Sequence, residues 1–526
     1  MVSMIPVAEL RAHLYGDGEV ALMDVREMGQ IAAGHILFSA PLPYSIFEVR
    51  LPELVPDLAV PLVLVDEGDG VAGRAAVRAE AMGYSDVAVL DGGVGAWAAA
   101  GYELFDGVNV PSKVFGELIE HAADTPRMPA EEVARRQAAG ERMVIVDGRP
   151  LDEYRKMNIP GAVCCPNGEL ALRIDALARE PDTTVVVNCA GRTRSIIGAQ
   201  TLIDVGIPNP VYALENGTQG WTLAGLDLEF GNDSDLAPDG PGAEARRGTA
   251  RELAARHGVT TLGRDDLAAW IADTQRTLYL FDVRDATDRA ADSTEIVALR
   301  DQHGVVHAPG GQLVQATDRW VGVRGARIVV LDTEGLRAPV IAAWLARLGH
   351  DVAVLEGGLA ALEGLAARLV PGPSTIDPLP TLSVDELEGA LATTQVIDLR
   401  SSAAFRAGHV PGSFWSSRPR VGYVAGRGLH VLIADDSVVA ALAANDLRAA
   451  GIGEILLLEG GIDAWQAAGL PMDQTPMSPP DAERIDFIFH THDRHSGNLA
   501  ASQAYLDWEV GLIARLHPDE RAVFRV

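Results

Sequence analysis

Cysteine is scarce in this chain, which holds 3 cysteines in 526 residues. So few thiols exclude a disulfide framework and are typical of proteins from a reducing compartment. Apolar runs long enough to cross a membrane are also lacking, and residues 1–22 contain no basic segment followed by an apolar core. We therefore expect a cytoplasmic protein without a signal peptide and without a membrane partner.

Positive charge is in short supply as well, because 43 Lys and Arg residues oppose 73 Asp and Glu residues and leave a net charge of −30. A field of this sign repels nucleic acids and anionic membranes, so neither is expected as a partner. It also repels an anionic substrate unless the binding site is locally basic. The composition is otherwise that of a globular protein, 48% hydrophobic and 22% charged, and the length predicts about three to five domains.

One short pattern occurs four times along the chain. Each time an apolar strand ends in Asp-x-Arg, and the pairs are Asp24/Arg26, Asp147/Arg149, Asp282/Arg284 and Asp398/Arg400. A second apolar strand, a helical stretch and a third strand that ends at a glycine turn follow in each unit. Apolar strands that alternate with helices predict a doubly wound α/β fold with a parallel sheet covered on both faces. The long repeat suits whole domains rather than turns of a solenoid.

The second unit differs from the others at the end of its second strand. There the apolar strand ends at Cys189, and a loop with Gly191, Arg192 and Arg194 leads into a helix expected from about Arg194. The dipoles at the start of that helix and the two arginines favour a thiolate, and the loop N–H groups suit an anion. A buried core cysteine is the alternative interpretation. A core cysteine does not need two arginines so close in sequence, which favours a catalytic Cys189.

The other three units carry acidic residues where the second unit has its cysteine, namely Asp66, Asp332 and Asp435. A carboxylate does not take up a sulfur atom as a persulfide, and an acidic loop repels anions. We therefore predict that the first, third and fourth units are catalytically silent. Their expected roles are packing, shaping access to the second unit, or binding a partner.

Taken together, these motifs resemble the rhodanese homology family. The resemblance is carried by the Asp-x-Arg openings, the cysteine loop, turns such as His409–Gly412, and the tryptophans four residues after a glycine turn (Trp97, Trp221 and Trp465). It implies four tandem rhodanese-like domains with parallel sheets and a C-terminal helical docking tail. We place them at residues 1–112, 113–235, 249–372 and 378–475, with the tail at 476–526.

The resemblance implies a thiosulfate sulfurtransferase that forms a persulfide on Cys189 and needs no cofactor or metal. The donor would be a small anion such as thiosulfate, and the acceptor cyanide, a thiol or a protein cysteine. We expect the oxyanions of the donor to be held by Arg192 and Arg194. The full set of expected binding residues is Ala190, Gly191, Arg192, Thr193, Arg194, Ser195, Arg149 and Glu169. Asp147 and Arg149 are expected first of all to form a structural ion pair, because all four units repeat it.

Two alternative functions stay open. Phosphatases and arsenate reductases of this fold carry an arginine six positions after the cysteine, whereas Ser195 occupies that position and Arg194 comes one residue earlier. The shorter loop favours sulfur over phosphate. A scaffold that relays sulfur to a bound protein acceptor is compatible with the enzyme interpretation, and a homo-oligomer is left open.

The remaining thiols and the tail carry weaker signals. Cys164 and Cys165 are adjacent and are expected as buried strand residues rather than as a sulfur relay or a strained disulfide. The histidines of segment 490–495 superficially resemble a zinc motif, but the chain after them is too short for the fold that uses it, so we expect no metal. Residues 499–516 predict an amphipathic helix that docks on a domain or on a second chain.

Overall fold

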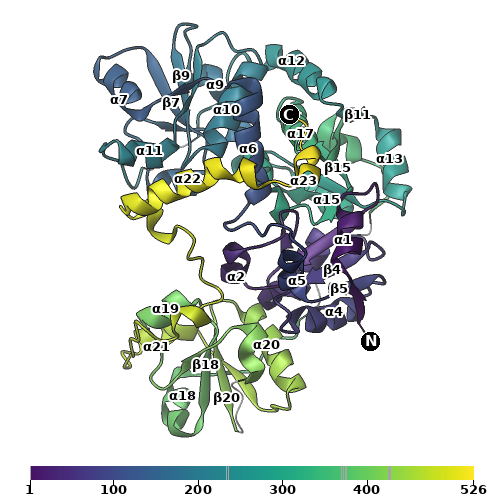
Figure 1. Cartoon of the computed structure of the whole chain (residues 1–526), viewed down its shortest axis with the longest axis vertical. Coiled ribbons are helices and arrows are strands. Elements are labelled where there is room, and N and C mark those ends of the chain that lie inside the picture. The colour runs from purple at the N-terminus through teal and green to yellow at the C-terminus, as the bar shows by residue number, and fades with distance from the viewer. Residues whose placement is uncertain are drawn as a thin grey trace.

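The computed structural model describes residues 2–526 except 233, 235, 369, 371, 373–375 and 424–427. It contains four sheets whose own strands are all parallel and which share one strand order (Figure 1). This confirms the predicted architecture of tandem doubly wound α/β domains. The domain limits drawn from the sequence stay a prediction, and the limit at residue 235 lies outside the described residues.

The first and second domains show the shared strand order. The first sheet runs β1 (Ser3–Ile5), β5 (Val87–Leu90), β4 (Leu62–Val65), β2 (Val20–Asp24), with β3 (Ala40–Pro41) also on β2. The second runs β6 (Arg127–Met128), β10 (Val211–Leu214), β9 (Thr184–Asn188), β7 (Met143–Asp147), β8 (Val163–Cys164). Their helices are α1 (Val7–Leu14), α2 (Met28–Ala33), α3 (Phe47–Leu54), α4 (Val71–Ala81), α5 (Gly93–Ala99), α6 (Val110–Ala123), α7 (Ala130–Ala138), α8 (Leu151–Lys156), α9 (Leu170–Leu177), α10 (Thr193–Asp204) and α11 (Gly217–Leu223).

The third and fourth domains repeat this order. The third sheet runs β11 (Thr260–Leu262), β16 (Asp351–Leu355), β15 (Arg327–Leu331), β12 (Leu278–Asp282), β13 (Val306–His307). The fourth runs β17 (Thr381–Leu382), β21 (Ile455–Leu458), β20 (His430–Ile433), β18 (Gln395–Asp398), β19 (Phe414–Trp415). Their helices are α12 (Ala243–Arg256), α13 (Arg264–Ala272), α14 (Ala286–Ala290), α15 (Thr294–His303), α16 (Gly310–Gln315), α17 (Arg337–Arg347), α18 (Val384–Ala390), α19 (Ser402–Ala407), α20 (Ser437–Ala449) and α21 (Gly461–Ala467).

The first three domains are fused by shared structure rather than strung along a linker. Strand β14 (Val323–Arg324), from the third domain, pairs antiparallel with β2 and extends the first sheet. The buried Tyr279 hydroxyl of the third domain donates to the Leu54 carbonyl of the first at the same junction. One apolar core also contains side chains from all three domains, among them Phe115 and Trp344, whose rings meet edge to face. The sheets therefore have a fixed mutual arrangement.

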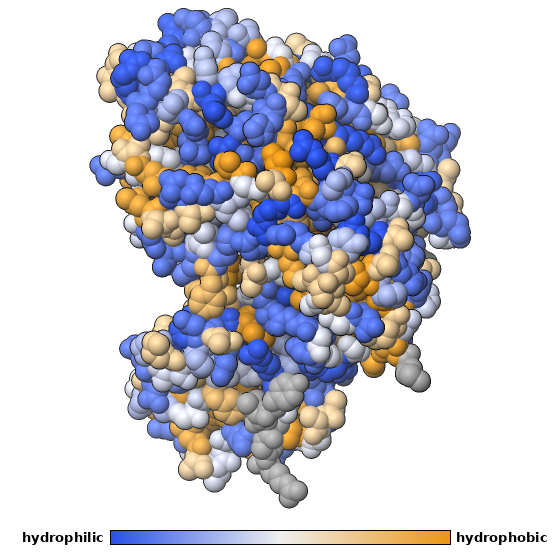
Figure 2. Space-filling view, in the orientation of Figure 1, coloured by the Kyte–Doolittle hydropathy of each residue, from blue (hydrophilic) through white to orange (hydrophobic). Residues whose placement is uncertain are grey.

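The fourth domain is attached differently, through charged groups on the first domain. Arg418 is fully buried and donates to both carboxylate oxygens of Glu48, at 2.6 and 2.7 Å, and to Asp446 at 2.9 Å. Figure 2 shows hydrophilic residues over most of the face in view and an indentation between this domain and the other three. The loop after β20, which corresponds to the cysteine loop, belongs to the separate fourth sheet and is far in sequence from Cys189.

The C-terminal tail returns to the second domain. Helix α22 (Leu499–Arg515) packs against α6 and α11, and α23 (Pro518–Val523) follows it (Figure 1). Phe524 is buried beside Phe38 and Phe115, so the tail ends inside the core shared by the first three domains. Among the described helices, none is long and apolar enough to cross a membrane.

Candidate active site

Strand β9 delivers Cys189 to the carboxyl edge of the second sheet. The cysteine follows the last strand residue, and α10 begins four residues later at Thr193, one residue before the expected start. The Cys189 side chain lies at the floor of this loop with 2% of its surface exposed, and the Ser195 hydroxyl donates to its Sγ at 3.1 Å. The positive end of the helix dipole therefore points at the sulfur, as the sequence predicts.

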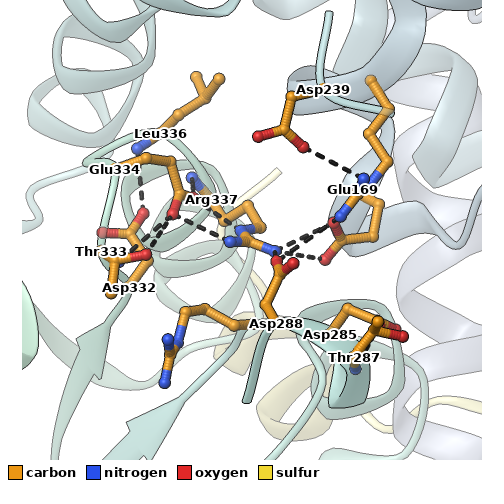
Figure 3. Close-up of polar contacts among 12 residues, drawn as sticks. Glu169, Asp239, Asp285, Thr287, Asp288, Asp332, Thr333, Glu334, Leu336 and Arg337 are labelled. Atoms are coloured by element: carbon orange, nitrogen blue, oxygen red, sulfur yellow. Dashed lines mark hydrogen bonds and ion pairs between the residues drawn. The ribbon is translucent and has the colours of Figure 1, made fainter. Parts of the chain in front are cut away.

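Residues 190–195 follow the end of β9, and we call their backbone N–H groups the Cys189 cradle. No group in the described part of the chain accepts a hydrogen bond from them. The first and third domains show how such a loop is arranged without a cysteine, because Asp66 and Asp332 follow the equivalent strands β4 and β15. The Asp66 carboxylate accepts three loop N–H groups at 2.8–3.1 Å, and the Asp332 carboxylate accepts three at 2.8–3.0 Å (Figure 3). These two loops are thus filled by their own carboxylates, whereas the N–H groups of the Cys189 loop have no such acceptor among the described residues.

Gly217, the first residue of α11, lies against the cysteine loop and allows the close approach of the two backbones. Gly217 adopts a left-handed backbone with φ of 56°, and a Cβ added there would lie 2.3 Å from the Cys189 carbonyl oxygen and 2.6 Å from that of Gly191. The following residues close the turn, since the Thr218 and Gln219 N–H groups donate to the carbonyls of Cys189 and Ala190. Close backbone approach at this point requires glycine.

Arg192 is placed away from the sulfur, which corrects the expectation that it holds the donor. Its guanidinium donates to both carboxylate oxygens of Glu117 at 2.7 and 2.9 Å, and also to Glu120 and Asn216. Burial disfavours its charge, but the Glu117 and Glu120 carboxylates outweigh that effect and raise its pKa. Arg192 therefore ties the loop to helix α6, and we no longer assign it to substrate binding.

Replacing Arg192 by methionine should lower the free energy of unfolding by about 3–5 kcal/mol, because Glu117 and Glu120 would remain buried without their cation. Burial already raises the pKa of Glu117, and loss of the Arg192 charge would raise it further, so protonation of Glu117 should remove part of the loss in stability as the pH falls. Urea denaturation at several pH values measures both effects. Adding Glu117→Gln should recover stability, and no recovery would show that the two side chains act independently.

Arg194 stays beside the cysteine but is held by a carboxylate. It donates to both oxygens of Glu153 at 2.8 Å, and its charge also interacts with Cys189. Burial opposes its charge, yet the ion pair with Glu153 keeps its pKa above the ordinary value. The third domain repeats the pair, with Arg337 on Asp288 at 2.6 Å (Figure 3). An arginine–carboxylate pair thus recurs at a loop without cysteine, which indicates that the Arg194–Glu153 pair positions the loop.

Arg149 lines the cavity next to the cysteine and forms the expected ion pair. Its guanidinium meets Asp147 at 2.7 Å and donates to the Met157 carbonyl at 2.6 Å. The equivalent arginine and aspartate are paired in all four domains, at 2.6–2.8 Å. The pair fixes the loops at the carboxyl edge of each sheet, and in the second domain Arg149 also lines the cavity.

Glu169 and Thr193 bond to other residues of the protein, which corrects the expectation that they bind the sulfur donor. The Glu169 carboxylate accepts from Arg173 at 2.9 Å and from Arg337 of the third domain at 3.0 Å, so it joins two domains instead of lining the cavity (Figure 3). The Thr193 hydroxyl donates to Glu509 of the tail at 2.6 Å. Both side chains hold the site together from outside.

The cavity above the loop has a volume of about 650 Å³ and is strongly cationic. The second domain, the helix before it, the third domain and the tail all contribute to its wall. Glu153 is the single carboxylate among its lining residues, against six cationic ones: Lys113, Arg149, Lys156, Arg194, Arg319 and Arg494. Three histidines, His490, His492 and His495, also line it. A chain of net charge −30 therefore presents a basic site, as an anionic substrate requires.

The tail supplies site residues that the sequence analysis missed. Glu509 of α22 is fully buried and accepts from Thr193 and, at 3.3 Å, from Lys113. Burial alone would raise the pKa of Glu509, but Lys113, Thr193 and Arg192 hold it below the usual value. Glu509 lies one helical turn from Tyr505 and Leu512 on the buried face of α22. The sequence does carry a signal for this role, because Glu509 is an acidic residue within the apolar face of the predicted amphipathic helix.

Cys164 and Cys165 are fully buried, as expected of strand residues. Burial raises the pKa of Cys164 to about 12 and raises that of Cys165 well above the ordinary value. Neutral, enclosed thiols are poor nucleophiles. Among the described residues, no group of three or more His, Cys, Asp or Glu side chains is arranged to hold a metal ion.

The fold and this loop define a class of protein: tandem α/β domains with one cysteine at the carboxyl edge of a sheet. The model of the Rhodanese-like domain matches residues 6–100, 129–224 and 383–468. The chain belongs to the rhodanese-like family, and the resemblance read from its sequence is confirmed. The third sheet lies outside the matched residues.

Known proteins similar to this chain include sulfurtransferases. A crystal structure of thiosulfate sulfurtransferase from Pseudomonas aeruginosa is 40% identical, with a TM-score of 0.86, and the match covers 100% of this chain and 99% of that one. Thiosulfate sulfurtransferase from Azotobacter vinelandii is 27% identical over 231 residues, which cover 36% of this chain and 84% of that protein. Two other curated relatives are matched over about half their length: an HTH-type transcriptional regulator from Mycobacterium tuberculosis (36% identical, 43% covered) and a putative sulfur carrier protein from Bacillus subtilis (31%, 54%). These matches cover 19% and 20% of this chain.

Proposed function

We propose that this protein is a sulfurtransferase with one active domain, which carries sulfane sulfur as a persulfide on Cys189. The observation that carries the proposal is that the N–H groups of the Cys189 cradle have no acceptor among the described residues and lie beside a cationic cavity lined by Ala190 and Arg194. The equivalent cradles around Asp66 and Asp332 are filled by carboxylates. The similarity to thiosulfate sulfurtransferases supports the same activity class.

In the first step the Cys189 thiolate attacks the outer sulfur of thiosulfate. A bond forms between Sγ and that sulfur, the sulfur–sulfur bond of thiosulfate breaks with its electron pair, and sulfite leaves as a dianion. The loop N–H groups stabilise the negative charge on the terminal persulfide sulfur. Ser195 orients Sγ through its hydrogen bond, and Arg149 and Arg194 lower the energy of the anions beside it.

In the second step a nucleophilic acceptor attacks the outer persulfide sulfur. Its bond to that sulfur forms, the bond to Sγ breaks, and Cys189 is released as a thiolate ready for the next donor. Cyanide, a small thiol or a protein cysteine fits this step. The two half-reactions share one cavity, so double-displacement kinetics are expected.

Exposure to thiosulfate tests the proposal directly by mass spectrometry. The intact protein should gain one sulfur, about 32 Da, and peptide mapping should place it on Cys189. Cys164 and Cys165 should stay unmodified, because their thiols are buried and neutral. A chain that stays unloaded, or that carries sulfur elsewhere, would contradict the proposal. A parallel assay with an aryl phosphate should give no hydrolysis, whereas turnover would favour the phosphatase alternative.

A further inference from the structure

Three cationic side chains of the cavity have no ion-pair partner. They are Lys156 at the end of α8, Arg319 in the third domain, and Arg494 in the tail. No carboxylate of the described residues lies within ion-pair distance of any of them, whereas Lys113, Arg149 and Arg194 are each paired. Cations from three separate parts of the chain thus line one cavity, Lys156 and Arg319 with exposed side chains and Arg494 half-buried, and a bound anion would supply the missing partner.

Arg494 is held in place rather than left loose. Its Nη1 donates to the Thr491 carbonyl at 3.1 Å, and its guanidinium lies 4.6 Å from the centre of the Tyr505 ring. Its Nε is buried and has no partner in the described part of the chain. His490 Nε2 and Gln315 Oε1, on the same cavity, are likewise buried without a partner. Buried polar atoms are normally paired, so these groups indicate a missing polar ligand.

The cavity is also too large for the donor alone. A thiosulfate ion fills on the order of 100 Å³, judged from the roughly 30 Å³ of a liquid water molecule. The cavity of about 650 Å³ lies instead in the range of sites for organic molecules. Space and charge beyond the Cys189 cradle therefore remain available when the small donor is bound.

We infer that this cavity binds an organic thiol with two or more acid groups as the sulfur acceptor, with the acid groups held by Lys156, Arg319 and Arg494. The inference rests on the proposed sulfurtransferase function. The acceptor thiolate attacks the outer sulfur of the Cys189 persulfide, its new sulfur–sulfur bond forms, and the bond to Sγ breaks to release the Cys189 thiolate. The product is the persulfide of the acceptor. Charge-assisted contacts to carboxylates fix the acceptor in reach of the sulfur.

This assignment gives the silent third domain and the tail a part in recognition. Arg319 and the helix α16 come from the third domain, and Arg494 comes from the segment before α22. A second domain alone would lack both cations and most of the wall. The loop of the third domain is filled by Asp332, so that domain contributes a surface instead of a reaction centre.

Matched acceptors test the inference with the full chain. Mercaptosuccinate carries two carboxylates and 2-mercaptoethanol carries none, and both are assayed with thiosulfate as donor. Lys156→Gln, Arg319→Gln and Arg494→Gln should each lower kcat/KM for mercaptosuccinate about 10-fold more than for 2-mercaptoethanol, as expected for a lost charged hydrogen bond. Arg155→Gln removes the same charge from the exposed neighbour of Lys156, which does not line the cavity, and should change neither ratio.

Binding measured without chemistry separates this inference from the proposed function. Calorimetry on the Cys189→Ser protein should show mercaptosuccinate binding that each of the three substitutions weakens about 10-fold and that Arg155→Gln leaves intact. Binding without any persulfide on the wild-type chain would sink the sulfurtransferase proposal and keep the anion site. The inference would be overturned if the three substitutions affected both thiols equally, if Arg155→Gln had the same effect as they do, or if mercaptosuccinate did not bind. Absence of binding would favour a protein acceptor, which needs no such site.

Discussion

Cys189→Ser should lower kcat/KM for sulfur transfer from thiosulfate to cyanide by at least about 10³-fold, because a serine oxygen forms no persulfide. The substitution changes one atom in a buried side chain that the Ser195 hydroxyl and the loop already position. The fold and the cationic cavity should persist, so a loss of activity reports on the chemistry. Initial rates of thiocyanate formation with purified variant and wild type make the measurement.

The matched control for that experiment is Cys165→Ala. Cys165 is as deeply buried, lies in an apolar cluster of the same domain and has no part in the proposed reaction. Its removal should cost about 1 kcal/mol of stability through a small cavity and leave the kcat of transfer within about twofold of wild type. Activity that survives in Cys189→Ser, or that vanishes in Cys165→Ala, would move the reaction to another thiol.

Gly217→Ala should lower kcat/KM for the same transfer about 10²-fold by displacing the cysteine loop. The added Cβ would overlap the carbonyl oxygens of Cys189 and Gly191, so the loop or α11 must shift. A displacement of about 1 Å between reacting groups is enough for such a loss. Stability should fall as well, because alanine in a left-handed backbone costs about 1–2 kcal/mol.

Gly225→Ala separates the two effects in Gly217→Ala. Gly225 is in the same domain and also has a positive φ, of 74°, but nothing lies within 4 Å of a Cβ added there. The Gly225→Ala protein should lose about as much free energy of unfolding from the backbone as Gly217→Ala does, and it should keep its sulfurtransferase activity. Thermal unfolding and transfer rates on both variants decide the matter. Equal activities would show that the loop tolerates a side chain at Gly217.

Local patterns predicted the parts of the site that neighbouring residues determine. The apolar run before Cys189 and the helix after it place the thiol at the carboxyl edge of a parallel sheet, and the structure confirms that sheet. The Asp147–Arg149 pair is separated by one residue, so its geometry is local too. Short-range hydrogen bonding and continuous apolar strands are properties of the sequence, and they repeat in all four domains.

These patterns do not predict which side chains pair when the partners are far apart in the sequence. Arg192 was expected to bind the donor because it follows the cysteine by three residues, but its partner Glu117 on α6 is 75 residues away in sequence. Glu169 meets Arg337 across a domain boundary, and β14 leaves its own domain to extend the first sheet. Which opposite charge lies nearest depends on how the domains pack, and periodicity carries no information about that.

The amino-acid sequence by itself specified four parallel α/β domains, one thiol among four equivalent loops, and a helix dipole aimed at that thiol, since each follows from contacts between near neighbours in the chain. The tertiary structure decided which charged side chains pair with other parts of the protein and which line the cavity. It gave Arg192 a partner on α6, Glu169 a partner in the third domain and Thr193 a partner in the tail. It also brought Lys156, Arg319 and Arg494 to one cavity. Those assignments depend on the mutual arrangement of the sheets and the tail, which burial of one shared core fixes only in the assembled chain.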